Sequence, residues 1–348
     1  MRGRGQDQSG GPGSTNYQAG RDIVHSGVSA SEAREIALDV YKSNFLVLSG
    51  IAEQVAADRA ERLTREFLDR LERKNASLLS RMQDPDMLSM VFTAQAGFAR
   101  SGEPDLETAL VDLLVDRAGQ EERDLKTLVL NGAIETLPKL TSVQRRALAL
   151  RFLFGHVGFT DLVAIEEFYA MVIQWSPTFD ISALKRADLQ YLQAAGAGSL
   201  GISSASLGML LANNFRGLYC TGFIAEDIPE ALRTFTDDKE VFITCVRDEE
   251  KLQVNAVGAR NVYDIQERKG ITSNALEGFA KGRVMNQQDI LAEMEDRIPD
   301  IAMVVDRWEK SGLANFELTA AGLAIGHAYW KQIVPADASA PLDIWLSD

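Results

Sequence analysis

A run of amphipathic segments, each ended by glycine or proline, extends from Ser29 to Trp175. Apolar residues recur there every three or four positions, which is the spacing of one face of an α-helix. One segment ends at Gly102, and another breaks before Pro138. Because these residue types end helices and the loops between them are short, neighbouring helices should pack antiparallel. The sequence therefore predicts an α-helical domain over residues 29–176.

Capping residues mark where some of these helices start. Ser29 or Ser31 can cap the first helix, because a serine oxygen accepts a hydrogen bond from a free backbone N–H. Thr141 or Ser142 can cap a later helix in the same way. These positions give the predicted helices defined beginnings as well as defined ends.

The longest segment, EQVAADRAERLTREFLDRLERKNASLLSRM, has an apolar stripe on one face and a dense mixture of Arg, Glu and Asp on the other. The stripe begins with Leu63, Phe67, Leu68 and Leu71. A solvated helix that packs along one side explains this pattern. An exposed stripe that pairs with a second copy of the chain explains it too, and the sequence leaves both open.

The second half of the chain mixes strand and helix patterns. KEVFITCVRD and KLQVNAVGA have the pattern of strands, residues 248–250 between them suit a hairpin turn, and GLYCTGFIAEDI also has strand character. Helical patterns follow over 286–298, after Pro299, and in the last segment TAAGLAIGHAYWKQI. Residues 177–348 are therefore predicted to form an α+β domain. The whole chain is expected to be mainly α, and α+β overall.

The stretch WEKSGLANFELTAAGLAIGHAYW resembles the tail of bacterial winged-helix domains. In it Leu318 anchors a short strand, Thr319 caps the following helix, and Gly322 allows close packing. Winged-helix modules bind DNA or serve as platforms for other proteins. The preceding helix offers Arg307 and Lys310, but acidic residues lie among them, and that balance suits phosphate binding poorly.

Composition bears on partners and compartment. The net charge of −14 disfavours nucleic acid as a partner, since that affinity depends largely on Lys and Arg. The 348 residues hold no apolar run long enough for a transmembrane helix, and the N-terminus lacks the apolar stretch of a secretory signal. Cys220 and Cys245 are not at CxxC spacing, which suits a reducing compartment. We therefore expect a cytoplasmic protein without a membrane span.

No catalytic, cofactor or metal motif stands out. GAGSLG at 196–201 matches GxGxxG, but a helix precedes it where a nucleotide site needs a strand, so it indicates a helix end and a loop. SALK at 182–185 lacks the companion motifs of SxxK enzymes. His25, His156 and His327 have no metal-ligand spacing, and the last two sit among apolar residues, as core histidines do. The sequence predicts no catalytic residue, no cofactor and no metal.

Residues 1–28 differ in composition from the rest of the chain. Gly-rich segments frame STNYQ and DIVHS, and Gly20-Arg21 supplies a turn between these β-forming pieces. One short hairpin is marginal in water, but stacked copies would bury apolar side chains and align amides in ladders. A disordered Gly/Ser-rich tail is the alternative. The hairpin interpretation predicts an oligomerisation site made of Asn16, Tyr17, Gln18, Arg21, Asp22, Ile23 and Val24.

The leader GPGSTNYQAGRDIV resembles a short GxxSxNxQAGRDI element found on diverse bacterial proteins, some of them thought to act in phage defence or other conflict systems. LPKLT, GLYCTGF and FELTAAGLAIGHAY extend the resemblance to an uncharacterised bacterial family with that leader and a mainly helical body. The resemblance implies no established activity and no catalytic residues.

Three functional hypotheses follow. The first is a non-enzymatic, homo-oligomeric cytoplasmic protein that binds a protein partner through its helical and winged-helix-like regions, in a defence setting. The second is a DNA-binding regulator that uses the C-terminal region, and it requires a clustered basic face. The third is an enzyme with a site in the α+β domain. It requires a deep pocket with convergent carboxylates, or a perturbed pKa at His327.

Overall fold

The computed structural model describes residues 28–44, 50–158, 164–271, 274–334 and 340–347. Helices dominate it, so the prediction of a mainly α chain is confirmed. The first half holds α1 (Ala30–Asn44), α2 (Ile51–Asn75), α3 (Pro85–Ser101), α4 (Pro104–Ala118), α5 (Leu125–Thr136), α6 (Ser142–His156) and α7 (Ile165–Gln174).

The second half alternates short helices with four short strands. The helices are α8 (Arg186–Ala194), α9 (Leu207–Asn214), α10 (Ala259–Lys269), α11 (Ala275–Lys281), α12 (Gln287–Arg297), α13 (Ile301–Ser311), α14 (Ala320–Ile333) and the 3₁₀-helix η7 (Leu342–Trp345). The strands are β1 (Gly198–Leu200), β2 (Phe242–Cys245), β3 (Asp248–Val254) and β4 (Phe316–Leu318). Among the described residues, no helix is both long and apolar enough to span a bilayer.

Local capping explains several helix boundaries. The Ser29 hydroxyl accepts a hydrogen bond from the Glu32 amide before α1, and the Glu32 carboxylate accepts one from the Ser29 amide. Thr141 and Gln144 form the same reciprocal pair at the start of α6. Each pair satisfies backbone donors that a helix start leaves free. Of the two pairs of candidate caps, the structure therefore uses Ser29 and Thr141.

The C-terminal helix α14 packs inside the helical bundle, against α4, α5 and α6. Two glycines permit the close approach. A Cβ atom at Gly322 would lie 1.9 Å from the Ala197 carbonyl oxygen, and one at Gly326 would lie 2.4 Å from Cβ of Phe152. Thr319 caps α14 by accepting from the Gly322 amide, as predicted. One continuous core consequently runs across residue 176, and the predicted domain boundary there stays a prediction.

Two antiparallel strand pairs complete the fold, β1 with β4 and β2 with β3. Gly196, with φ of +82°, follows the end of α8, so a helix and not a strand precedes GAGSLG, as predicted. The predicted loop is wrong in part, because Gly198–Leu200 form strand β1, which pairs with β4. The predicted hairpin turn at 248–250 is wrong, because these residues begin β3 and the turn is Val246-Arg247. The Gln253 side-chain oxygen accepts from the Val246 amide at 2.9 Å and so stabilises the turn at that position.

Residues 216–285, hereafter the lobe, are inserted between α9 and α12, two helices that pack against each other. The chain enters and leaves the lobe through two adjacent segments, the neck. There the Thr221 amide donates to the Arg283 carbonyl at 2.7 Å, and the Met285 amide donates to the Tyr219 carbonyl at 2.9 Å. The lobe contains β2, β3, α10 and α11 and has its own apolar core, which includes Phe223.

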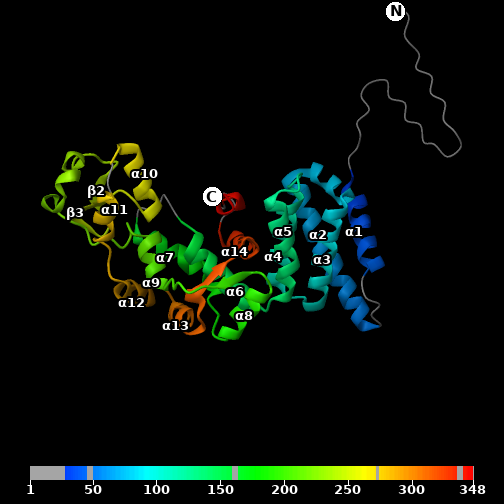
Figure 1. Cartoon of the computed structure of the whole chain (residues 1–348). Helices are drawn as coiled ribbons and strands as arrows, with labels where there is room; N and C mark the ends of the chain where they lie inside the picture. The colour runs from blue at the N-terminus through cyan, green and yellow to red at the C-terminus, as the bar shows by residue number, and fades with distance from the viewer. Residues whose placement is uncertain (1–27, 45–49, 159–163, 272–273, 335–339, 348) are drawn as a thin grey trace, which may run out of the picture.

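The other described elements, α1–α9 and α12–α14, form the body. Figure 1 shows an elongated arrangement in which α1, α2 and α3 lie at one end and the lobe lies at the opposite end. The helices α6, α8, α13 and α14 occupy the middle, and α7, α9 and α12 lie next to the lobe. The chain therefore holds the lobe far from the helix that follows the N-terminal leader.

Candidate functional site

The predicted oligomerisation residues lie outside the described residues. They are Asn16, Tyr17, Gln18, Arg21, Asp22, Ile23 and Val24, all within the first 27 positions. Whether this leader forms a stacked hairpin stays a prediction. The candidate site that the described residues offer is in the lobe, at the end of the molecule opposite α1.

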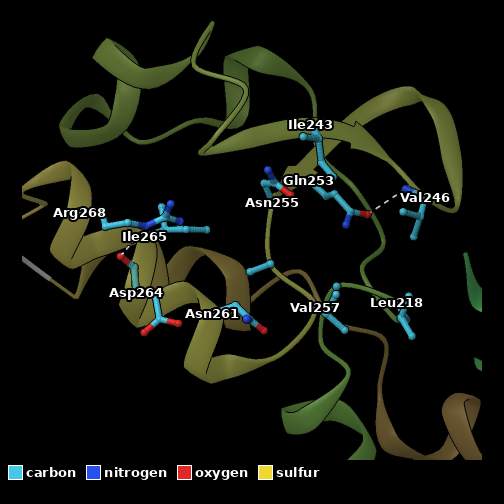
Figure 2. Close-up of a pocket in the computed structure, with 12 residues that line it drawn as sticks. Leu218, Ile243, Val246, Gln253, Asn255, Val257, Asn261, Asp264, Ile265 and Arg268 are labelled. Carbon is cyan, nitrogen blue, oxygen red and sulfur yellow. Dashed lines mark hydrogen bonds between the residues drawn. The ribbon is translucent and has the colours of Figure 1, made fainter. Parts of the chain in front are cut away.

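A cavity of about 250 Å³ lies in the lobe between the β2–β3 hairpin and α10, next to the neck. Figure 2 shows the hairpin side chains on one side of it, those of α10 on another, and Leu218 with Val257 below. We call it the neck cavity. Clefts between structural units are common places for ligands, and this cavity mixes apolar walls with amide and charged groups.

The periodicity of the lobe sequence explains why these side chains converge. Ile243 and Gln253 are directly opposite in the β2–β3 register, so their side chains leave the same face of the hairpin. On α10 the residues that line the cavity are Asn261, Asp264, Ile265 and Arg268. Their spacing of i, i+3, i+4 and i+7 is that of one helical face. A strand face and a helix face are thus turned toward each other across a gap.

The floor of the neck cavity depends on a tight backbone crossing. The Gly217 amide donates to the Val257 carbonyl at 2.7 Å, and a Cβ atom at Gly217 would lie 2.0 Å from the Ala256 carbonyl oxygen. The Gly258 amide donates to Oδ1 of Asn261 at 3.0 Å, which caps the start of α10. Glycine at 217 therefore allows the neck to lie directly under the hairpin and α10.

Gln253 is the best-defined polar group of the site. Its side chain is buried, with 3% of its surface exposed, and its Oε1 atom accepts from the Val246 amide. No hydrogen bond of its Nε2 atom is found among the described residues, and Figure 2 shows this nitrogen directed away from Val246, toward the side of the cavity where Val257 lies. Buried amide N–H₂ groups are normally hydrogen-bonded, so one that faces a cavity can donate to a ligand bound there.

The remaining polar groups lie toward the rim. Asn255 donates through Nδ2 to the Lys239 carbonyl at 3.0 Å, which leaves Oδ1 as an acceptor. Nε of Arg268 reaches the Asp264 carbonyl at 3.4 Å. Neither the Asp264 carboxylate nor the Arg268 guanidinium belongs to an ion pair among the described side chains. The rim therefore offers one negative and one positive group, both open to solvent.

A second polar cluster connects the lobe to the body through hydrogen bonds. Arg247 of the hairpin turn donates to Glu293 of α12 at 2.6 Å, and Tyr169 of α7 donates to the other Glu293 oxygen at 2.9 Å. Burial opposes ionisation of Glu293, but the bonds from Arg247 and Tyr169 outweigh it and lower its pKa. Burial raises the pKa of Tyr169 to about 12. These groups are held in one protonation state and connect the two parts of the molecule.

The two described histidines serve the packing of the body. His327 is buried, its Nε2 lies 2.9 Å from the Ala340 carbonyl, and burial lowers its pKa. His156 stacks on Phe152 with ring centroids 6.1 Å apart. Burial, and then the charge of Arg151, lower the pKa of His156 to about 4. Both histidines are therefore neutral near pH 7.

The pKa of His327 is perturbed, as the enzyme hypothesis requires. His327 lines a separate cleft of about 560 Å³ with Asp116 and Lys331. There the Lys331 ammonium already pairs with the Asp116 carboxylate at 2.9 Å. No group of three His, Cys, Asp or Glu side chains in the described part of the chain could hold a metal ion. The enzyme hypothesis stays a prediction.

The basic residues of α13 lie beside an acidic partner. Arg307 approaches Asp306 at 3.9 Å, and Lys310 forms an ion pair with the same carboxylate. A carboxylate shared by two cations reduces the positive field that a phosphate would meet. The DNA-binding hypothesis, which needs an unopposed basic face, draws no support from this helix and stays a prediction.

Sequence reasoning missed the neck-cavity residues. The signal that could have found them is the stripe Asn261, Asp264, Ile265 and Arg268, which mixes polar and apolar groups on one face of a short helix. A helix that only packs on a core shows an apolar stripe there. The opposing residue Gln253 carries no such signal, because its neighbour across the hairpin depends on the register of the strands.

Comparison with known proteins places the chain in a family without pointing to an activity. One family model, described only as “:-like”, matches residues 27–346. The match covers the body and the lobe and begins after the predicted oligomerisation residues. No curated protein and no solved structure matches the chain.

Proposed function

The protein belongs to the family that this model describes, and we propose that it is a non-enzymatic, homo-oligomeric interaction protein. In this proposal the leader joins copies of the chain, the body is a rigid spacer, and the lobe contacts a protein partner. The setting we propose is the bacterial cytoplasm, in defence against phage, and its support is the resemblance of the leader to elements of conflict systems.

The observation that carries the proposal is the separation of the two ends. The leader precedes α1 at one end of the body, and the lobe occupies the other end (Figure 1). The lobe also exposes large apolar side chains, with Ile224 50% and Tyr263 52% accessible. An oligomer joined through its leaders would present several lobes at once, and several weak contacts would then act together.

The test is the mass of the protein in solution at micromolar concentration. We expect the full chain to be oligomeric and a chain without residues 1–28 to be monomeric. The double variant Tyr17→Asp with Ile23→Asp should also be monomeric, because charged side chains cannot be buried in a stack of hairpins. Its circular dichroism should keep the helical signal of the full chain.

A matched control makes the same chemical change at the other end of the molecule. Tyr263→Asp with Ile224→Asp also replaces one tyrosine and one isoleucine by aspartate, at positions that are exposed on the lobe. This variant should keep the oligomer and lose partner binding. A monomeric full chain, or a leader variant with an unchanged mass, would refute the proposal.

A further inference from the structure

We propose that the neck cavity binds a flat, uncharged heteroaromatic ring of the nucleobase class, such as the base of a nucleoside. This inference does not depend on the oligomer, since every residue that lines the neck cavity belongs to the lobe and none to the leader. Its support comes from the size of the cavity, its two facing walls, and two amide donors in its lining for which the described part of the chain offers no acceptor.

Size limits the ligand first. Drug-sized ligands occupy pockets of roughly 300–1,000 Å³. The neck cavity, at about 250 Å³, is smaller than that range. It has room for one ring system with its substituents, but not for an extended cofactor or a folded peptide.

The walls favour a flat ligand. Ile243 projects from the hairpin, Ile265 projects from the facing side of α10, and Val257 lies on the floor. A planar ring placed between the hairpin and the helix would contact apolar side chains on both faces. Burial of such ring faces supplies most of the binding free energy of small ligands in sites of this kind.

The amide donors in the cavity lining indicate which hydrogen-bonding groups the edge of the ligand ring must carry. Nε2 of Gln253 faces the cavity with no acceptor among the described residues. Asn261 uses its Oδ1 to cap α10, and no acceptor for its Nδ2 is found among the described side chains and backbone. Two amide donors match a ring that carries carbonyl and ring-nitrogen acceptors. Nucleobases carry both kinds of acceptor on their edges.

The rim argues against a strongly charged ligand. Asp264 and Arg268 both line the cavity, so a carboxylate or an ammonium group placed between them would gain from one and be repelled by the other. A neutral ring that also bears N–H groups can instead donate to the Asp264 carboxylate or to Oδ1 of Asn255. A neutral ring with mixed edge groups uses all of these contacts.

The experiment uses the full chain and four nucleosides, guanosine, adenosine, cytidine and uridine. Binding is measured by saturation-transfer NMR and by calorimetric titration. We expect at least one nucleoside to bind with a Kd of about 1 mM or tighter, with saturation transferred to the protons of the base. The chain without residues 1–28 should bind equally well, which separates this test from that of the oligomer.

Asn261→Asp is the decisive variant. An aspartate at this position still accepts from the Gly258 amide, so α10 keeps its cap, but the N–H₂ donor is lost. We expect about a tenfold loss of affinity. Asn75→Asp is the matched control, since Asn75 also caps a helix by accepting from a backbone amide, that of Ser77, and is exposed on the body. It should bind as the unaltered chain does.

A cavity-filling variant covers the case in which Asn261→Asp alters the lobe. Ile243→Phe places a larger ring in the cavity from a strand position that suits aromatic residues. It should abolish binding while thermal unfolding stays close to that of the unaltered chain. The proposal is overturned if none of the four nucleosides binds at several millimolar, or if binding survives both variants.

Discussion

The body and the lobe bury their polar groups in different ways. In the body the buried Arg145 donates to the Leu140 carbonyl at 2.5 Å, to the Tyr329 hydroxyl at 2.9 Å, and to the carboxylates of Glu103 and Asp105. In the lobe and its neck, Gln253 keeps an amide nitrogen beside a cavity, with no acceptor among the described residues. Nε of Arg216 likewise has no partner within the described part of the chain. The body also holds buried side-chain nitrogens without a described partner, those of Trp175 and Trp330, but they are packed in its core.

This difference indicates where the molecule can respond to other molecules. A close-packed core has one stable arrangement and little room for a ligand. In a small unit with a cavity and amide donors beside it, a ligand that occupies the cavity and accepts hydrogen bonds from those donors gains binding free energy. We therefore expect a ligand to bind at the lobe and its neck rather than within the core of the body.

The largest effect should follow from breaking the Arg145 network. Arg145→Met leaves the carboxylates of Glu103 and Asp105 without their shared cation and frees the buried Tyr329 hydroxyl. Removal of one member of a buried ionic network costs about 4 kcal/mol. Urea unfolding should show this loss in the free energy of unfolding. Arg34→Met is the control, because Arg34 pairs with Glu61 at the surface and should cost less than about 1 kcal/mol.

The next test asks whether the lobe opens independently of the body. Leu114→Ala in the body and Leu276→Ala in the lobe both remove a fully buried side chain, at about 3 kcal/mol each. The two cysteines of the chain, Cys220 and Cys245, lie buried in the lobe, and burial raises the pKa of Cys220 to about 11. Alkylation of these thiols therefore requires the lobe to open.

We expect Leu276→Ala to raise the rate of alkylation by iodoacetamide about 100-fold, the equivalent of 3 kcal/mol. Leu114→Ala should leave that rate nearly unchanged, because the body core is separate from the lobe core. Equal acceleration by the two variants would mean that the body and the lobe unfold as one cooperative unit.

Acid should destabilise the body more than the lobe. Both described histidines lie in the body, and the pKa of His156 is lowered to about 4, so the unfolded chain binds more protons than the folded chain between that pH and about 6.5. The contribution of neutral His156 to the free energy of unfolding is therefore fully present above pH 6.5. It falls by about 2 kcal/mol as the pH drops toward 4. His156→Phe keeps a ring against Phe152 and should flatten this part of the urea-unfolding profile. An unchanged slope would exclude His156 as its source.

Local features of the sequence predicted most of the body. Ser29 and Thr141 cap helices because their oxygens reach amides two or three residues away, and Gly322 permits contact with Ala197 as its position in α14 suggested. Such effects act over one helical turn and are visible in the sequence. The same approach placed the hairpin turn wrongly, because acidic residues 248–250 looked like a turn while Gln253, several residues away, stabilises Val246-Arg247.

The candidate site could not be predicted in the same way. The neck joins residues 219–221 with 283–285, two segments that are more than 60 residues apart in the sequence. A pairing over such a distance leaves no periodic trace in either segment. The cavity that lies beside this neck depends on it, since the crossing of Gly217 under Ala256 brings the floor to the hairpin. The leader residues 16–24 gave a site prediction from composition alone, and it stays a prediction.

The smallest effect should come from replacing the ion pair of the neck. Arg216 and Glu277 form a pair with side chains only 5% and 16% exposed, and the described residues offer no acceptor to Nε of Arg216. Replacement of a buried ion pair by apolar residues of similar volume is often neutral or stabilising, because the cost of removing two charges from water disappears. Arg216→Met with Glu277→Leu should therefore unfold in urea within about 1 kcal/mol of the unaltered chain, whereas Arg216→Met alone should be clearly less stable since it leaves Glu277 unpaired. A double variant as unstable as Arg145→Met would show that the buried ion pair of the neck stabilises the fold as much as the Arg145 network stabilises the body. The contrast between the two regions would then be wrong.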